Sequence, residues 1–166
     1  MRMLSVFFVL FLAFTFSLNT YAKNLFNHTG LPIPRFVSLA SDEINARKGP
    51  GKKYPIALQY QKKDLPVEII AEYEHWRKIK DPAGQENWVH KSLLLGDRYG
   101  FIKAGSTLNV YKKPKQESHK ILKIEGPNTF RILKCKGNMC RISIQSFRGW
   151  VVKDAFFGVY PDERLN

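Results

Sequence analysis

The residues of this chain that could do covalent chemistry are few and scattered. The four histidines are His28, His75, His90 and His119. None of them stands at metal-ligand spacing from another histidine or from a cysteine. No G-x-S-x-G motif, P-loop or dinucleotide-binding fingerprint is present, and adjacent acids such as Asp42 and Glu43 would point to opposite faces of a strand. The sequence therefore predicts no catalytic residue, no metal site and no cofactor, and an enzyme is the least expected class of protein.

The two cysteines have a spacing that suits a covalent crosslink. Cys135 and Cys140 flank the segment Lys-Gly-Asn-Met, which is typical of a hairpin turn between FRILKC and CRISI. Opposed residues of an antiparallel pair lie close enough for a disulfide. In an exported protein such a pair is expected to be oxidised. We therefore predict one disulfide, which would also remove the Cys135 thiol as a possible nucleophile.

Residues 1–22 have the pattern of a secretory signal peptide. Arg2 precedes an apolar run over residues 4–16, and Thr20-Tyr21-Ala22 places small residues before a possible cleavage site. The run is shorter than the roughly 20 residues that span a bilayer as a helix. An uncleaved anchor is the alternative reading, but the short run favours cleavage after Ala22. We expect a protein exported to the periplasm or secreted, with no transmembrane segment in the mature chain.

Positive charge is concentrated in the second half of the chain. The formal net charge is +13. Residues 36–97 hold 10 basic and 9 acidic residues, a net of +1, whereas residues 98–166 hold 14 basic and 5 acidic residues, a net of +9. This asymmetry indicates an anionic partner for the second half, or a charge that only aids solubility.

Five lysines are the candidates for binding an anion: Lys112, Lys113, Lys115, Lys120 and Lys123. The first three fall in a YKKPK segment that is expected to be an exposed loop. The other two fall in the predicted strand KILKI, where a bulge could turn one of them away.

Short apolar runs between turn signals recur along the chain and predict an all-β fold. The two halves also align with each other. INARKGP from Ile44 corresponds to LNVYKKP from Leu108, and NWVHKSLL from Asn87 corresponds to GWVVKDAF from Gly149. VEII with FRIL and WRKI with MCRI fall between them in the same order, at offsets of 62 to 64 residues. The sequence therefore indicates an internal duplication of a unit of about 60 residues, close to the smallest size that folds alone.

These blocks resemble the bacterial SH3 domain family, of an exported, alphaproteobacterial type. The opening block INARKGPGKKYPI is similar to the family motif Asn-x-Arg-x-Gly-Pro followed by Tyr-Pro, and the tryptophan-valine pairs at 88–89 and 150–151 are similar to its closing signature. The matching motif residues are Asn45, Arg47, Gly49, Pro50, Tyr54 and Pro55. Gly49-Pro50-Gly51 is suited to a tight loop. The second repeat departs from the motif, because Tyr111 and Lys113 replace its arginine and glycine.

The resemblance implies two tandem small SH3-like β-barrels, over residues 36–97 and 98–160. A linker over residues 23–35 would precede them, and a tail over residues 161–166 would follow. SH3-like barrels present aromatic side chains beside loops, so the candidate ligand-binding residues are Tyr54, Tyr60, Trp88, Tyr111 and Trp150. Trp76 is expected to fill the barrel core, whereas Trp88 and Trp150 could lie in the core or on the surface.

Three functions follow from these features. The first is a non-enzymatic exported binding module that recognises peptidoglycan or peptide segments of the cell envelope, as the resemblance implies. The second is an accessory or targeting protein for a cell-wall hydrolase, which would share the fold. The third is a basic binder of anionic polysaccharide, lipid or nucleic acid, of which nucleic acid is the least expected. A strong salt dependence would separate this third function from binding in an aromatic groove.

Overall fold

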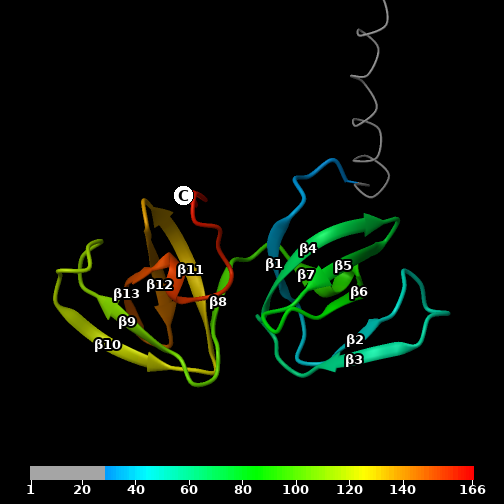
Figure 1. Ribbon diagram of the computed structural model, residues 1–166, viewed down its shortest axis with the longest axis horizontal. Helices are drawn as coiled ribbons and strands as arrows, with labels where there is room; N and C mark the ends of the chain where they lie inside the picture. Colours follow the sequence, from blue (N-terminus) through cyan, green and yellow to red (C-terminus); the bar gives the residue numbers. More distant parts are fainter. Residues whose placement is uncertain (1–28) are drawn as a thin grey trace, which may run out of the picture.

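The computed structural model describes residues 29–166, which form an all-β protein of two antiparallel sheets (Figure 1). The all-β fold predicted from the sequence is confirmed. The predicted signal peptide over residues 1–22 and the start of the expected linker lie outside the described residues. The two sheets share no strand, and each is built from one half of the chain.

The first sheet contains seven strands in the order β3-β2-β6-β5-β4-β1-β7. The strands are β1 (Arg35–Leu39), β2 (Ile44–Arg47), β3 (Ile56–Tyr60), β4 (Pro66–Tyr73), β5 (Trp76–Lys80), β6 (Glu86–His90) and β7 (Leu94–Leu95). A short 3-10 turn, η1 (Lys91–Leu93), follows β6. Alternation of buried and outward residues is clearest in β2 and β5, as expected of strands with one face on a core.

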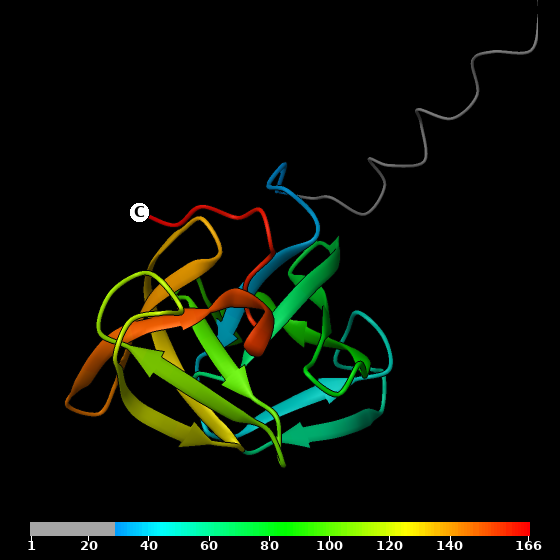
Figure 2. The same cartoon turned by 60° about the vertical axis from the view of Figure 1, so that its left-hand side comes forward.

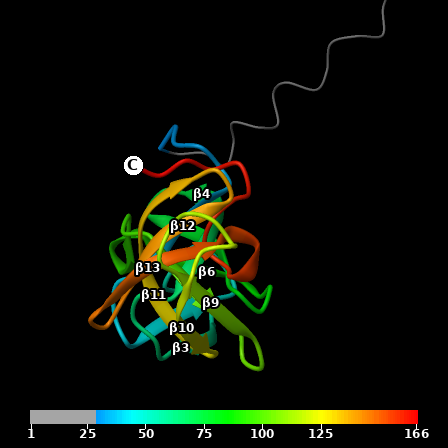
Figure 3. The same cartoon turned by 90° about the vertical axis from the view of Figure 1, so that its left-hand side faces the viewer.

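The second sheet contains six strands in the order β10-β9-β13-β12-β11-β8. The strands are β8 (Tyr99–Ile102), β9 (Thr107–Tyr111), β10 (Lys120–Glu125), β11 (Asn128–Lys136), β12 (Met139–Ile144) and β13 (Phe147–Val152), and η2 (Lys153–Ala155) follows them. This order is that of β1 to β6 in the first sheet, strand for strand. The internal duplication seen in the sequence thus corresponds to a repeated topology. In Figure 3 the second sheet faces the viewer, with β9 to β13 labelled.

Each sheet encloses its own apolar core. The first core consists of Leu39, Ile44, Ala46, Tyr60, Leu65, Val67, Ile69, Ile79 and Val89. The second consists of Ile102, Leu108, Val110, Ile124, Phe130, Ile132, Cys135, Cys140, Ile142 and Val151. Apart from Leu65, which precedes β4, these side chains come from the inward positions of successive strands. Their burial is the main favourable contribution to folding of each half.

The hairpin between β11 and β12 carries the predicted disulfide. Cys135 and Cys140 are directly opposed in the register, their Cα atoms are 4.0 Å apart, and their sulfur atoms are bonded. Gly137 has a φ of 58°, a left-handed conformation that glycine adopts without steric cost at the turn. The disulfide prediction is confirmed.

The two halves pack against each other around Phe36 of β1. Its ring lies edge-on to Phe157, with ring centroids 5.1 Å apart, and 4.7 Å from the ring of Tyr160. The Tyr160 hydroxyl donates a hydrogen bond of 2.7 Å to the Glu68 carboxylate. The C-terminal segment that carries these rings, red in Figure 2, therefore connects the second half to the first.

The segments expected to be a linker and a tail both make ordered contacts. Thr29 and Arg35 hydrogen-bond to Glu72 of β4. At the other end, the Leu165 carbonyl accepts a hydrogen bond from the Cys135 amide, and the Leu165 side chain packs against the second core. Residues 29–35 and 161–166 are thus integral parts of the two folded halves.

Candidate functional site

A transverse row of outward-facing residues crosses each sheet and has a tryptophan at its centre. Directly opposed residues of neighbouring strands share a face of the sheet, so the register defines these rows. The first row consists of Ala71, Lys78, Trp88, Arg47 and Ile56. The second row consists of Lys134, Arg141, Trp150, Tyr111 and Lys120. The rows correspond strand for strand, at the sequence offsets of 62 to 64 that the repeat alignment has.

Both central tryptophans lie on the outer surface. Val89 and Val151, which follow them, are fully buried in the two cores, so the neighbouring indoles must point the other way. Trp88 and Trp150 are half-buried, with part of each indole open to solvent. The sequence allowed either a core or a surface position for Trp88 and Trp150, and the structure places both on the surface.

In the first row both cations already have partners. Lys78 Nζ lies 2.6 Å from a carboxylate oxygen of Glu86, and this hydrogen bond and charge lower the pKa of Glu86. The Arg47 guanidinium donates a hydrogen bond of 2.7 Å to the Tyr54 carbonyl. Ile56 at the end of the row is 51% exposed. The first row therefore offers an indole and an apolar side chain beside two engaged cations, of which Lys78 is paired with a carboxylate and Arg47 is bound to a backbone carbonyl.

In the second row the cations lack acidic partners. Lys134, Arg141 and Lys120 are exposed, and within residues 29–166 none of them forms an ion pair. The Lys134 ammonium lies over the Trp150 ring, 5.8 Å from its centroid. Arg148 occupies the position that corresponds to Glu86 in the first sheet. The second row therefore places an indole among free positive charges.

The family motif at the start of the first repeat builds a loop. A Cβ atom on Gly49 would lie 2.4 Å from Tyr54 Cδ1, so the ring packs directly on the glycine. The Lys53 ammonium lies 5.5 Å from the centroid of the same ring. Asn45 Oδ1 accepts a hydrogen bond of 3.2 Å from Gln59. Together with the Arg47 bond, these contacts fix the turn that contains Pro50 and Gly51, and leave Tyr54 half-buried.

Two of the five aromatic candidates are closed to a ligand. Tyr60 and Tyr111 are each only 7% exposed. The Tyr60 hydroxyl donates to Asp81 at 3.1 Å, and burial together with this carboxylate raises the pKa of Tyr60. Neither ring has a free face, so the aromatic candidates for ligand binding reduce to Tyr54, Trp88 and Trp150.

The prediction that Trp76 fills the barrel core is wrong. The inward positions of β5 are taken by Arg77 and Ile79, so Trp76 falls on the outer face and is half-buried there. Its ring lies edge-on to His90, with the ring centroids 5.6 Å apart. Trp76 therefore adds an aromatic side chain to the face that carries Trp88.

The five candidate lysines are all exposed but fall in two groups. Lys112, Lys113 and Lys115 lie in the loop between β9 and β10. A register shift between residues 120 and 122 brings Lys120 and Lys123 to the same outer face of β10, although strict alternation would place them on opposite faces. Only Lys120 belongs to the second row.

Sequence reasoning missed the cations beside Trp150. Arg141 corresponds to Lys78 in the repeat alignment, and extending the aligned FRIL block by one residue reaches Lys134. Mapping the neighbours of Trp88 onto the second repeat through this alignment would have identified Arg141 and Lys134.

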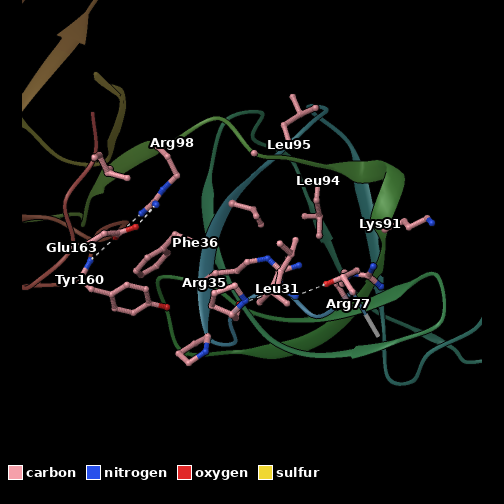
Figure 4. A pocket seen from close by; sticks show the side chains of 17 residues that line it. Leu31, Arg35, Phe36, Arg77, Lys91, Leu94, Leu95, Arg98, Tyr160 and Glu163 are labelled. Carbon is pink, nitrogen blue, oxygen red and sulfur yellow. Dashed lines mark hydrogen bonds and ion pairs between the residues drawn. The ribbon is translucent and has the colours of Figure 1, made fainter. Parts of the chain in front are cut away.

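A groove of about 900 Å³ lies where the two halves meet (Figure 4). Its lining is largely apolar and includes Leu31 and Leu95, which are 51% and 40% exposed. Behind them Glu72, which is fully buried, binds Arg35 at 2.5 Å and Arg77 at 3.2 Å. Nothing in the strand pattern of the sequence distinguished this acid from a solvated one.

The Glu72 carboxylate remains charged despite its burial. Burial raises its pKa, but hydrogen bonds from Arg35 and from the Thr29 hydroxyl and amide, with the charge of Arg77, outweigh that effect and hold the pKa below its ordinary value. Because its oxygens are occupied by these partners, the cluster stabilises the wall of the groove and is not free to bind a ligand.

Within residues 29–166 no three histidine, cysteine, aspartate or glutamate side chains come together as a metal site. The same part of the chain contains no helix of the length and apolarity needed to cross a membrane.

Residues 40–96 match the family model described as "Bacterial SH3 domain". This match over residues 40–96 confirms the resemblance to the bacterial SH3 domain family that the motifs of the first repeat indicated. The second half, outside this match, repeats the same strand order.

Two solved structures from Trichomonas vaginalis are similar to this chain. NlpC2 is 17% identical with a TM-score of 0.34, and the match covers 74% of this chain and 47% of that one. NlpC1 is 15% identical with a TM-score of 0.35, covering 78% of this chain and 47% of that one. The chain thus spans about half the length of these structures. No curated protein matches the sequence significantly.

Proposed function

We propose that this protein is a non-enzymatic binding module that is exported to the cell envelope and recognises peptidoglycan or its peptide segments through the two tryptophan rows. The observation that carries the proposal is that the same outward row is present twice, with Trp88 and Trp150 at equivalent positions. The match of residues 40–96 to the bacterial SH3 domain family supports it.

The two tryptophans are suited to binding because they are amphipathic and partly exposed. Tryptophan is enriched among the residues that dominate binding energy, since a large rigid ring buries much area at little entropic cost. Each indole has a cation beside it, Lys78 in the first row and Arg141 in the second. Such a pair can cover a sugar or peptide plane and hydrogen-bond to its polar edge.

Two rows on one protein also suit a polymer with repeated units. The halves are joined by the Phe36 and Tyr160 contacts, so the rows belong to one body. Once one row has bound a strand, the second meets its ligand at an effective concentration of the order of millimolar. Modest affinity at each row would then give useful retention on a cell wall.

The test is cosedimentation of the purified protein with isolated peptidoglycan sacculi. We expect Trp88→Ala or Trp150→Ala to weaken the apparent affinity about tenfold or more, and the double variant further. Phe147→Ala is the matched control, because Phe147 is an aromatic residue 47% exposed on β13 outside the row. Circular dichroism would verify folding. Failure of the wild-type protein to bind, or full binding by the folded double variant, would overturn the proposal.

A further inference from the structure

The second row carries more free positive charge than the first. The corresponding residues are Ala71 and Lys134, Lys78 and Arg141, Arg47 and Tyr111, and Ile56 and Lys120. Two positions that are uncharged in the first row hold lysines in the second. At one further position, Tyr111 of the second row replaces Arg47 of the first row. The Arg47 guanidinium is already bound to the Tyr54 carbonyl.

Lys134 and Arg141 are directly opposed on β11 and β12. Side chains at opposed positions have Cβ atoms about 4.5–5.5 Å apart, and like charges placed there destabilise a sheet. No acid of residues 29–166 forms an ion pair with either of them. A bound anion would relieve this repulsion, and the guanidinium fork of Arg141 matches a carboxylate or phosphate.

The charged neighbours on the same face reinforce this field. Arg148 lies on β13 two residues before Trp150, and Lys123 lies on β10. Arg131 is paired with Asp97 at 2.8 Å, so it contributes no net charge. Glu125, at the far end of β10, is the one unpaired acid that the register places on this face. The area around the row is therefore strongly positive.

The indole separates the cations along the row. Neighbouring strands are about 4.8 Å apart, so Arg141 lies one strand from Trp150 and Lys120 lies two strands away on the other side. A ligand that fits has a ring to stack on the indole and anionic groups on both sides of it. This is the composition of a glycan chain that carries acidic groups at intervals.

We propose that the second row binds an acidic glycan strand, with its carboxylate or phosphate groups on Lys134, Arg141 and Lys120 and a sugar ring on the part of the Trp150 indole that the Lys134 ammonium leaves open. The choice of a glycan over a nucleic acid rests on the proposed function, which places the protein in the envelope, where acidic glycans are accessible. The first row, in which Lys78 is paired with Glu86 and Arg47 is held by the Tyr54 carbonyl, binds uncharged parts of the ligand.

The test is a titration of the purified protein by tryptophan fluorescence and calorimetry with four probes. They are oligogalacturonate for carboxylate, a glycerol-phosphate oligomer for phosphate, neutral dextran and oligo(dT). We expect oligogalacturonate, the glycerol-phosphate oligomer or both to bind, and dextran not to bind. The affinity for the bound probe should fall as the salt concentration rises. Lys134→Glu with Arg141→Glu should weaken binding at least about tenfold.

The matched control is Lys113→Glu with Lys115→Glu, which makes the same change in net charge on the neighbouring loop. We expect it to weaken binding less than about threefold, because neither lysine belongs to the row and the charges of exposed loop residues are screened by salt. If Lys134→Glu with Arg141→Glu impairs folding, the neutral variant Lys134→Gln with Arg141→Gln takes its place in the titration. Equal losses in both double variants, preferential binding of oligo(dT), or no binding of the acidic probes would overturn the proposal. Binding to sacculi without binding to the acidic probes would leave the proposed function standing and reject this inference alone.

Discussion

Replacing Glu72 by glutamine should strongly destabilise the first half of the protein. The carboxylate is fully buried and accepts hydrogen bonds from Thr29, at 2.8 Å from its amide, and from Arg35 at 2.5 Å, and it forms an ion pair with Arg77 at 3.2 Å. Glutamine has the same shape but no charge, so two guanidinium groups would lose their counter-ion. Removing one partner of a buried ion pair costs about 3–5 kcal/mol.

The lower end of that range applies here. The side chain of Arg35 is 20% exposed, so water can solvate part of its charge. Arg77 keeps hydrogen bonds to the carbonyls of Glu74 and Trp76. We therefore expect a loss of about 3 kcal/mol at pH 7, which lowers the urea midpoint by roughly 1–3 M for a small domain. Far-UV circular dichroism during urea titration measures this shift.

The stability difference between the wild-type protein and Glu72→Gln should also depend on pH. The folded pKa of Glu72 lies below its unfolded value of 4.5, so its contribution is fully present above that pH and is lost as the pH falls through the folded pKa. The gap between the wild-type protein and Glu72→Gln should therefore narrow below about pH 4.5. Glu86→Gln, which makes the same change in an exposed ion pair with Lys78, should leave the midpoint nearly unchanged. A Glu72→Gln variant as stable as the wild type at pH 7, or a gap that does not vary with pH, would refute this reasoning.

Two further substitutions test local features. Replacing Cys135 and Cys140 by serine opens a short loop, so we expect the free energy of unfolding of the second half, measured with urea, to fall by roughly 2 kcal/mol. An unchanged free energy, or two titratable thiols in the oxidised wild-type protein, would contradict the disulfide. Gly49→Ala would bring a Cβ within 2.4 Å of the Tyr54 ring, so we expect a loss of about 1–3 kcal/mol from overpacking in thermal unfolding. An unchanged midpoint would show that the Tyr54 ring is not fixed on this glycine.

The sequence predicted the strands and the hairpin because their signals are local. The short apolar runs between turn signals and the Lys-Gly-Asn turn after Cys135 are visible in a few neighbouring letters. The position of Trp76 was predicted wrongly, because the inward place was taken by the next residue, Arg77, whose partner Glu72 lies on another strand. The residue pattern of a single strand does not show that the charge of a buried residue is balanced by an opposite charge on another strand.

Which face each residue of β11 occupies depends on an irregularity that has no clear sequence signal. Strict alternation from Phe130 and Ile132 would turn Lys134 inward, but a register shift between residues 132 and 134 turns it outward and Cys135 inward. The groove between the halves was likewise unpredictable, because it requires Phe36 and Tyr160, which are far apart in the sequence, to meet.

The most direct test of the central claim is to locate the bound ligand by NMR. The protein labelled with ¹⁵N would be titrated with muramidase-digested peptidoglycan, and the indole N–H signals of Trp76, Trp88 and Trp150 would be followed with the backbone amides. We predict that the signals of Trp88 and Trp150 shift, together with amides of β5, β6, β12 and β13. Shifts confined to the groove residues around Leu31 and Tyr160, or no shifts at saturating ligand, would contradict the account.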